Sequence, residues 1–99
     1  MSYYENYNSL PEKINKKDAE IIHTKKRALE RFDIVLNNED IKNIRYKIRN
    51  NKSNTLGQLS NRVSIHLLNY KNKEMLFLYD QDRNAPITVL YPEWANNLQ

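Results

Sequence analysis

His23, Arg27 and Arg31 follow one another at intervals of four residues, so they share one face of the chain if the segment is a continuous helix. Histidine titrates near neutral pH, and a guanidinium group binds phosphate through two parallel hydrogen bonds. These residue types in this row are suited to binding and cleaving a phosphodiester. The alternative is an ordinary charged helix face, because Glu30 and Asp33 lie close enough in the sequence to pair with the arginines.

A second polar row is predicted on a strand over residues 62–70, where Arg62, Ser64 and His66 alternate with apolar residues. The apolar residues of this alternation are Val63, Ile65 and Leu67. If the helices cover that apolar side, the polar row lines an open groove. The alternative is that the row is the solvated outer face of a two-layer protein. Hydroxyl groups near the groove are expected from Tyr79, Thr88 and Tyr91.

Basic residues are concentrated in one part of the chain. The 99-residue sequence has 16 Lys or Arg against 12 Asp or Glu, a formal net charge of +4, but residues 41–73 contain no acid. The basic residues of this stretch are Lys42, Arg45, Lys47, Arg49, Lys52, Arg62, Lys71 and Lys73. Such a stretch predicts a surface for RNA phosphates or for an acidic protein; the alternative is ordinary surface lysines. The side chains expected to contact nucleic acid are those of Arg31, Arg45, Arg49, Lys52, Arg62 and His66.

Several classes of chemistry have no support in the sequence. Cysteine is absent, which excludes disulfides and thiolate zinc sites, and the two histidines have no obvious third metal ligand. Gly-rich phosphate loops, nucleophile elbows and zinc-protease motifs are also absent, so neither a metal nor a cofactor is expected. No apolar run approaches the roughly 20 residues of a membrane span, and the N-terminus lacks the apolar core of a signal peptide. We therefore expect no membrane contact and a cytoplasmic location, in the host if the chain is phage-encoded.

The first predicted helix lies within residues 17–32, where the apolar residues cover about a third of the helical circumference. Its start is ambiguous. Asp18 caps a long version, whereas Thr24 caps a short version in which His23 is extended and free to turn towards the sheet.

The second predicted helix is preceded by Asn37 and Asn38, either of which is a good N-cap, and acidic residues follow in its first turn. Its apolar stripe consists of Ile41, Ile44 and Ile48.

The remaining segments show the period of strands. Alternating residues bounded by turn signals predict strands over 55–59, 62–70, 74–80 and 87–91. The predicted fold class is α+β, with two N-terminal helices packed on one face of a four-stranded antiparallel sheet. The predicted organisation is a Tyr/Asn-rich arm over 1–16, a single domain over 17–92 and a C-terminal tail over 93–99. Trp94 is expected to anchor that tail, the alternative being a platform for base stacking.

The segment HTKKRALERFDIVL (residues 23–36) resembles the first motif of small phage-type proteins in the barnase/EndoU/colicin/RelE-like nuclease superfamily. That motif has a histidine four residues before an arginine, then Glu-Arg, an aromatic residue and alternating aliphatics. The resemblance continues in SNRVS (60–64), LFLYD (76–80) and ITVL (87–90), and it spans about residues 20–92.

The resemblance implies helices followed by a curved antiparallel sheet, and metal-independent RNA cleavage in which a ribose 2′-hydroxyl attacks the adjacent phosphate. It makes His23 the acid or base and Arg27 a phosphate clamp, with Arg62, Ser64 and Thr88 completing the pocket. His66 has no counterpart in the pattern, and the superfamily also includes members that only bind.

The expected function is that of a small metal-independent ribonuclease or nuclease-like RNA-binding domain, phage-borne or toxin-like. The alternative is a non-catalytic phage accessory, virion or inhibitor protein that binds a protein or nucleic acid. RNA is the expected partner; an acidic protein or antitoxin is the other candidate.

Overall fold

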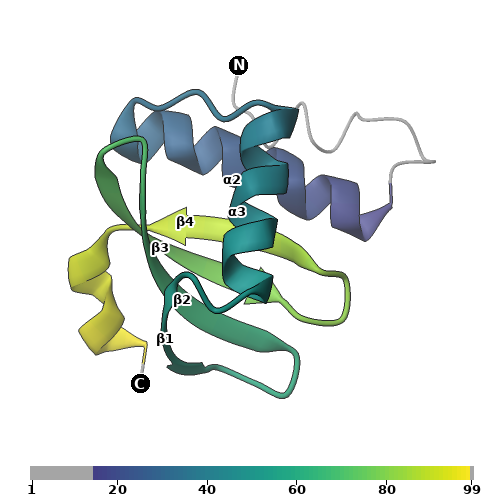
Figure 1. Ribbon diagram of the computed structural model, residues 1–99, viewed down its shortest axis with the longest axis vertical. Helices are drawn as coiled ribbons and strands as arrows, with labels where there is room; N and C mark the ends of the chain where they lie inside the picture. The colour runs from purple at the N-terminus through teal and green to yellow at the C-terminus, as the bar shows by residue number, and fades with distance from the viewer. Residues whose placement is uncertain (1–14, 99) are drawn as a thin grey trace.

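The computed structural model describes residues 15–98, so most of the arm expected over residues 1–16 lies outside the described residues. Two α-helices precede four strands and a closing 3-10 helix (Figure 1). The elements are α2 (Lys16–Phe32), α3 (Asn38–Arg49), β1 (Asn54–Gln58), β2 (Val63–Tyr70), β3 (Lys73–Asp80), β4 (Ala85–Leu90) and η1 (Pro92–Asn97). The α+β class predicted from the sequence is confirmed.

Helix α2 starts earlier than either version predicted from the sequence. Asn15 is its N-cap, and the Asn15 side chain accepts a hydrogen bond of 2.8 Å from the backbone N–H of Asp18. The short version was wrong because Thr24 is needed inside the helix: its hydroxyl is fully buried and donates to the carbonyl oxygens of Glu20 and Pro86. His23 therefore lies in mid-helix.

Helix α3 matches its prediction closely. Asn37 and Asp40 form a reciprocal capping box, in which each side chain accepts from the backbone N–H of the other residue. The predicted stripe of Ile41, Ile44 and Ile48 is buried in the main hydrophobic core.

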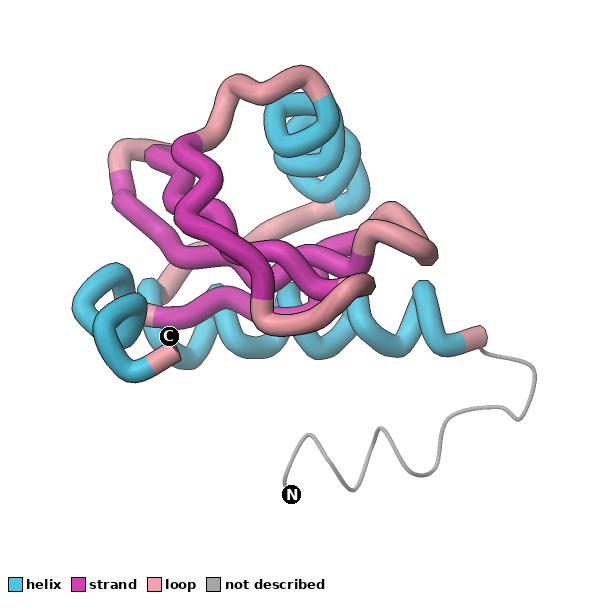
Figure 2. Tube along the Cα trace, turned by 90° about the horizontal axis from the view of Figure 1, so that it is seen from below, coloured by secondary structure: helices cyan, strands magenta, loops and turns pink. Residues whose placement is uncertain are grey.

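The strands form one antiparallel sheet in the order β1-β2-β3-β4, which is a meander because each strand pairs with the next one in the sequence. The β1–β2 pairing shifts register between Thr55 and Gly57, where Gly57 adopts a φ of 152°. Figure 2 shows α3 over the sheet and α2 running along β4. The sheet therefore has a helix against edge strand β4, while β1 forms the opposite edge.

The two faces of the sheet are reversed relative to the expectation. Register pairs Ser64 with Tyr79 and His66 with Phe77, so these residues share the face that packs under α3. Ser64 and His66 are 1% and 6% exposed rather than open to solvent. The prediction was wrong because it used the alternation of β2 alone. The apolar residues of β3 that meet α3 are Met75, Phe77 and Tyr79, and cross-strand pairing places Ser64 and His66 on their side.

The opposite face is buried as well. Ile65 and Leu76 are 1% and 0% exposed, and η1 packs against β3 near them. The predicted tail is thus a short helix for most of its length. The Trp94 ring meets Tyr91 edge-on at a centroid distance of 5.2 Å, and the Arg31 guanidinium lies 4.9 Å from the centre of the Trp94 ring. These contacts fit the anchoring role expected for Trp94.

Candidate functional site

A cavity of about 450 Å³ opens where the C-terminal end of α3 approaches the sheet. Helix α3, the loop after it, β1, β2, β3 and the β3–β4 turn all contribute to its wall. The lining residues are Ile48, Arg49, Asn51, Thr55, Ser64, His66, Tyr79, Gln81 and Asn84. No Asp or Glu is among these described lining residues, so the cavity is suited to an anionic ligand.

Ser64 and His66 form a hydrogen-bonded pair in this cavity. They lie two residues apart on β2, which places them on the same face of the strand. Ser64 Oγ lies 2.7 Å from His66 Nε2. The other ring nitrogen, Nδ1, lies 3.1 Å from Ser53 Oγ and 3.2 Å from Thr55 Oγ1. Hydroxyl groups thus contact the imidazole on both sides.

His66 is a neutral ring whose two nitrogens both face hydroxyl groups. Burial lowers the pKa of His66 below its usual value, so the ring is neutral at pH 7. In a neutral imidazole one nitrogen donates and the other accepts. In the tautomer with the proton on Nδ1, that N–H points at the hydroxyl oxygens of Ser53 and Thr55, and Nε2 accepts the hydroxyl hydrogen of Ser64. In that tautomer His66 has the geometry of a base for the Ser64 hydroxyl.

Two arginines extend towards the same site from α3. Arg45 and Arg49 are four residues apart and hence on one helix face. With its amide oxygen towards α3, Asn84 accepts from Arg45 Nη2 and Arg49 Nη1 at 3.2 Å each, and its amide nitrogen donates to Tyr79 Oη. Asn84 itself has a φ of 56° in the β3–β4 turn, a conformation that asparagine tolerates well.

Tyr79 supplies a neutral hydroxyl to this group. Burial raises the pKa of Tyr79 above its usual value, and the hydrogen bond and positive charge of Arg45 oppose the shift only in part. Tyr79 therefore keeps its proton at physiological pH and remains a potential donor. Its ring also meets the His66 ring edge-on, at a centroid distance of 6.0 Å.

The α2 row predicted to be catalytic is located elsewhere. None of His23, Arg27 and Arg31 is among the described residues that line the cavity. Arg27 Nη1 pairs with Glu30 Oε1 at 2.6 Å, and Arg31 Nη1 donates to the carbonyl oxygen of Val89 at 2.8 Å. The pKa of His23 is lowered by burial and by the charges of the two arginines. The two arginines of this α2 face thus contact groups of the protein itself, Glu30 and the Val89 carbonyl oxygen.

Three further candidates also lie outside the cavity wall. Arg62 pairs with Asp80 at 3.4 Å, and Thr88 pairs with Leu78 on the face opposite His66. Lys52 follows α3 and lies over the Tyr46 ring, 5.8 Å from its centre. Of the residues predicted from the sequence, Ser64, His66 and Arg49 line the cavity, and Arg45 contacts the lining residue Asn84.

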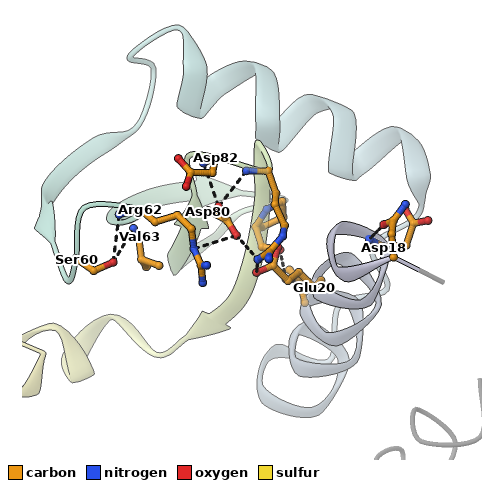
Figure 3. A network of polar contacts seen from close by, with 11 residues as sticks. Asp18, Glu20, Ser60, Arg62, Val63, Asp80 and Asp82 are labelled. Atoms are coloured by element: carbon orange, nitrogen blue, oxygen red, sulfur yellow. Dashed lines mark hydrogen bonds and ion pairs between the residues drawn. The ribbon is translucent and has the colours of Figure 1, made fainter. Parts of the chain in front are cut away.

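The Arg62–Asp80 pair belongs to a second polar cluster, shown in Figure 3. Asp80 is fully buried and accepts from the backbone N–H groups of Asp82 and Arg83 and from the Arg83 side chain. Burial alone would raise the pKa of Asp80, but these bonds and one from Glu20 hold it below its usual value. Burial and the Asp80 carboxylate raise the pKa of Glu20 to about 7. Glu20 lies on α2 and Asp80 ends β3, so these two carboxyl groups bring the two elements together.

Neither cluster has the composition of a metal centre. Among residues 15–98, no group of three or more His, Cys, Asp or Glu side chains is placed to hold a metal ion. No helix in the described part of the chain is long and apolar enough to cross a membrane.

Sequence reasoning missed Asn84 and the hydroxyls of Ser53 and Thr55, and it named Tyr79 only for its hydroxyl group. Asn84 carried one usable signal, because asparagine in a hairpin turn often adopts a positive φ. The convergence of these residues depends on strand register and on where α3 ends, which the local sequence does not report. Comparison of this chain with protein-family models, curated proteins and solved structures finds no match.

Proposed function

We propose that this protein is an RNA-binding domain of the nuclease-like type, which holds an RNA phosphate in the cavity between α3 and the sheet and cleaves the phosphodiester without a metal. One observation supports this above all: the Arg49 guanidinium, a neutral histidine and a protonated tyrosine line a cavity whose described lining contains no carboxylate, and Arg45 contacts the lining residue Asn84.

Phosphate binding is assigned to Arg45 and Arg49. Their contacts on Asn84 are hydrogen bonds to a neutral amide, and no carboxylate among residues 15–98 forms an ion pair with either arginine. Arg45 Nε is buried and has no acceptor among residues 15–98. An unpaired buried donor destabilises the protein, which marks Arg45 as a residue not fully satisfied by the fold. A phosphate oxygen is the acceptor best matched to the charge and shape of a guanidinium group.

Cleavage is assigned to His66 and Tyr79. The reaction needs a base for the attacking hydroxyl, an acid for the leaving oxygen and positive charge at the phosphate. His66 Nε2 lies within hydrogen-bond distance of a hydroxyl oxygen, and the Tyr79 hydroxyl retains its proton. These assignments replace the roles that the sequence suggested for His23 and Arg27.

Binding to a labelled single-stranded RNA tests the proposal. The double variant Arg45→Ala/Arg49→Ala should bind roughly 10- to 100-fold more weakly, and the slope of log K against log[salt] should fall by about 1.4. The matched control is Lys26→Ala/Arg27→Ala, which removes the same charge from α2, where both side chains pair with Glu30. Equal losses in the two double variants would show that only net charge matters and would refute a site in the cavity.

A second function, binding of an acidic protein partner, is supported by a different surface. Leu29 and Val35 are 50% and 70% exposed, and they line a groove beside Lys25 and Lys26. Apolar side chains next to lysines suit a partner segment with apolar and acidic residues. Under this proposal Leu29→Asp abolishes a complex that the Arg45→Ala/Arg49→Ala variant retains. The wild type, Leu29→Asp and Arg45→Ala/Arg49→Ala are each tested for co-purification with one identified partner, and the pattern of retained complexes distinguishes the two functions.

A further inference from the structure

The hydroxyl group beside His66 Nε2 is that of Ser64, a residue of the protein and not of a substrate. Ser64 Oγ lies 2.7 Å from His66 Nε2, within the range of a strong hydrogen bond, and both residues line the cavity. A serine hydroxyl is a weak nucleophile until an adjacent base takes its proton. Ser64 and His66 therefore have the spacing of a nucleophile and its base.

The base is oriented as such a pair requires. Ser53 and Thr55 place hydroxyl oxygens at His66 Nδ1, which fixes the ring and leaves Nε2 facing Ser64. These hydroxyls stand where a carboxylate orients the histidine in serine hydrolases. A neutral orienting group stabilises the imidazolium less than a carboxylate does, so we expect His66 to be a slower base that still has the correct geometry.

The cavity also supplies charge near Ser64. Cross-strand pairing sets Ser64 opposite Tyr79, and Tyr79 connects through Asn84 to the guanidinium groups of Arg45 and Arg49. Positive charge at this point stabilises the additional negative charge that develops on a phosphate under attack. An ester with an anionic phosphorus centre fits these surroundings better than a neutral carboxylic ester does.

We propose that Ser64 is a nucleophile that attacks a phosphodiester in this cavity and forms a covalent phosphoserine intermediate. Ser64 Oγ bonds to phosphorus as its proton passes to His66 Nε2. The bond between phosphorus and the leaving oxygen breaks, and that oxygen takes the proton from Nε2. A water molecule then gives a proton to His66 Nε2 and attacks phosphorus. The bond between phosphorus and Ser64 Oγ breaks, and Oγ takes that proton back from Nε2, which restores the Ser64 hydroxyl and the neutral histidine. Because the protein supplies the nucleophile, the substrate needs no 2′-hydroxyl.

The inference rests on the proposed binding of phosphate in the cavity, but its first test needs no RNA. The full-length protein is treated with an alkyl fluorophosphonate, whose fluoride leaves when a serine attacks phosphorus, and the adduct is located by peptide mass spectrometry. Ser64 should carry the label. Ser60→Ala should label at the wild-type rate, because Ser60 lies in the β1–β2 turn and accepts from the backbone N–H groups of Arg62 and Val63. His66→Gln should label about 100-fold more slowly.

The location of the label in the wild-type protein decides the question even if a variant does not fold. Labelling at Ser60 or at other surface serines with none at Ser64 would overturn the inference.

A second test separates the inference from the proposed function. The wild-type protein is incubated with an RNA and with the same sequence carrying 2′-O-methyl riboses, and products are resolved on a denaturing gel. Cleavage of both, with a covalent protein–oligonucleotide band that Ser64→Ala lacks, supports the serine nucleophile. Cleavage of RNA alone, with 2′,3′-cyclic phosphate ends, overturns it and leaves the proposed function intact. Absence of RNA binding, with Ser64 still labelled by the fluorophosphonate, refutes the RNA function and leaves the nucleophile in place.

Discussion

The arginine pairs of α2 and α3 have the same spacing but opposite surroundings. On α2, one arginine pairs with Glu30 and the other donates to the carbonyl of Val89. On α3, both arginines converge on the neutral amide of Asn84, beside a cavity. Residue type and spacing therefore predict which donors share a face, whereas their neighbours determine whether those donors hold the fold together or remain available to a ligand.

The two histidines provide the sharpest test of this difference. His66→Ala should lower the rate of phosphodiester cleavage at least about 100-fold, the usual effect of removing a general base. His23→Ala should leave the rate within about twofold. Both rates are measured on a fluorescent RNA in EDTA, with circular dichroism to verify folding. If His23 were essential and His66 dispensable, the catalytic site would lie on α2 and not in the cavity.

Arg31 should matter for stability and not for the ligand. Arg31→Ala removes the hydrogen bond to the Val89 carbonyl and the cation–π contact with Trp94, and should lower the free energy of unfolding by about 1–3 kcal/mol. Urea denaturation measures this loss, and RNA affinity should stay within about twofold. A variant that is fully stable but has lost RNA affinity would place Arg31 with the cavity arginines.

Glu20 should make the α2 side of the molecule sensitive to pH. Its pKa is about 7 in the folded protein and 4.5 as the ordinary value. Because the folded pKa is the higher one, the stabilisation is complete below about pH 4.5 and is lost as the pH rises through 7. The wild type should therefore lose several degrees of thermal midpoint relative to Glu20→Gln between pH 5 and pH 8.

The quantity to compare is the difference in thermal midpoint between the wild type and Glu20→Gln at each pH. His23 and His66, whose folded pKa values are lowered, act in the opposite direction over the same range and are present in both. A constant difference in midpoint from pH 5 to pH 8 would show that Glu20 does not share its proton with Asp80.

The smallest effect is expected at Arg27. Its pairing with Glu30 is an exposed contact within one helix, and such pairs contribute less than about 1 kcal/mol. Arg27→Ala should change the free energy of unfolding by no more than about 0.5 kcal/mol and leave RNA affinity unchanged. If Arg27→Ala lost as much RNA affinity as Arg45→Ala in the same titration, the arginines of α2 and α3 would not differ in their availability to RNA.

Much of the fold could be predicted because its signals are local. The capping residue Asn37, the stripe of α3 and the hairpins are each specified by a few adjacent residues. Local sequence could not predict which face of β2 packs under α3. Cross-strand pairing places Ser64 and His66 on the same side of the sheet as the apolar residues of β3. The short version of α2 was wrong for a related reason. Thr24 is a good N-cap residue by type, but its hydroxyl donates a hydrogen bond to the carbonyl oxygen of Pro86, which lies 62 residues away.

The candidate site was partly visible for the same reason. From the sequence, Ser64 is expected to complete a catalytic pocket, and His66, Arg45 and Arg49 are expected to contact nucleic acid. Their assembly depends on the length of α3 and on the β3–β4 turn that presents Asn84, which are tertiary properties. The row on α2 was the more conspicuous one in the sequence, because its three members lie within nine residues of each other.

The two bonds from α2 to β4 also bear on how the molecule avoids aggregation. An edge strand with free carbonyl and amide groups can recruit a strand from another molecule. Along β4, Thr24 and Arg31 occupy the carbonyl oxygens of Pro86 and Val89, and Pro86 has no amide hydrogen to offer. The opposite edge, β1, is five residues long and interrupted by the shift at Gly57. Shortening α2 would thus expose a strand able to recruit a second chain and would favour fibrous assembly.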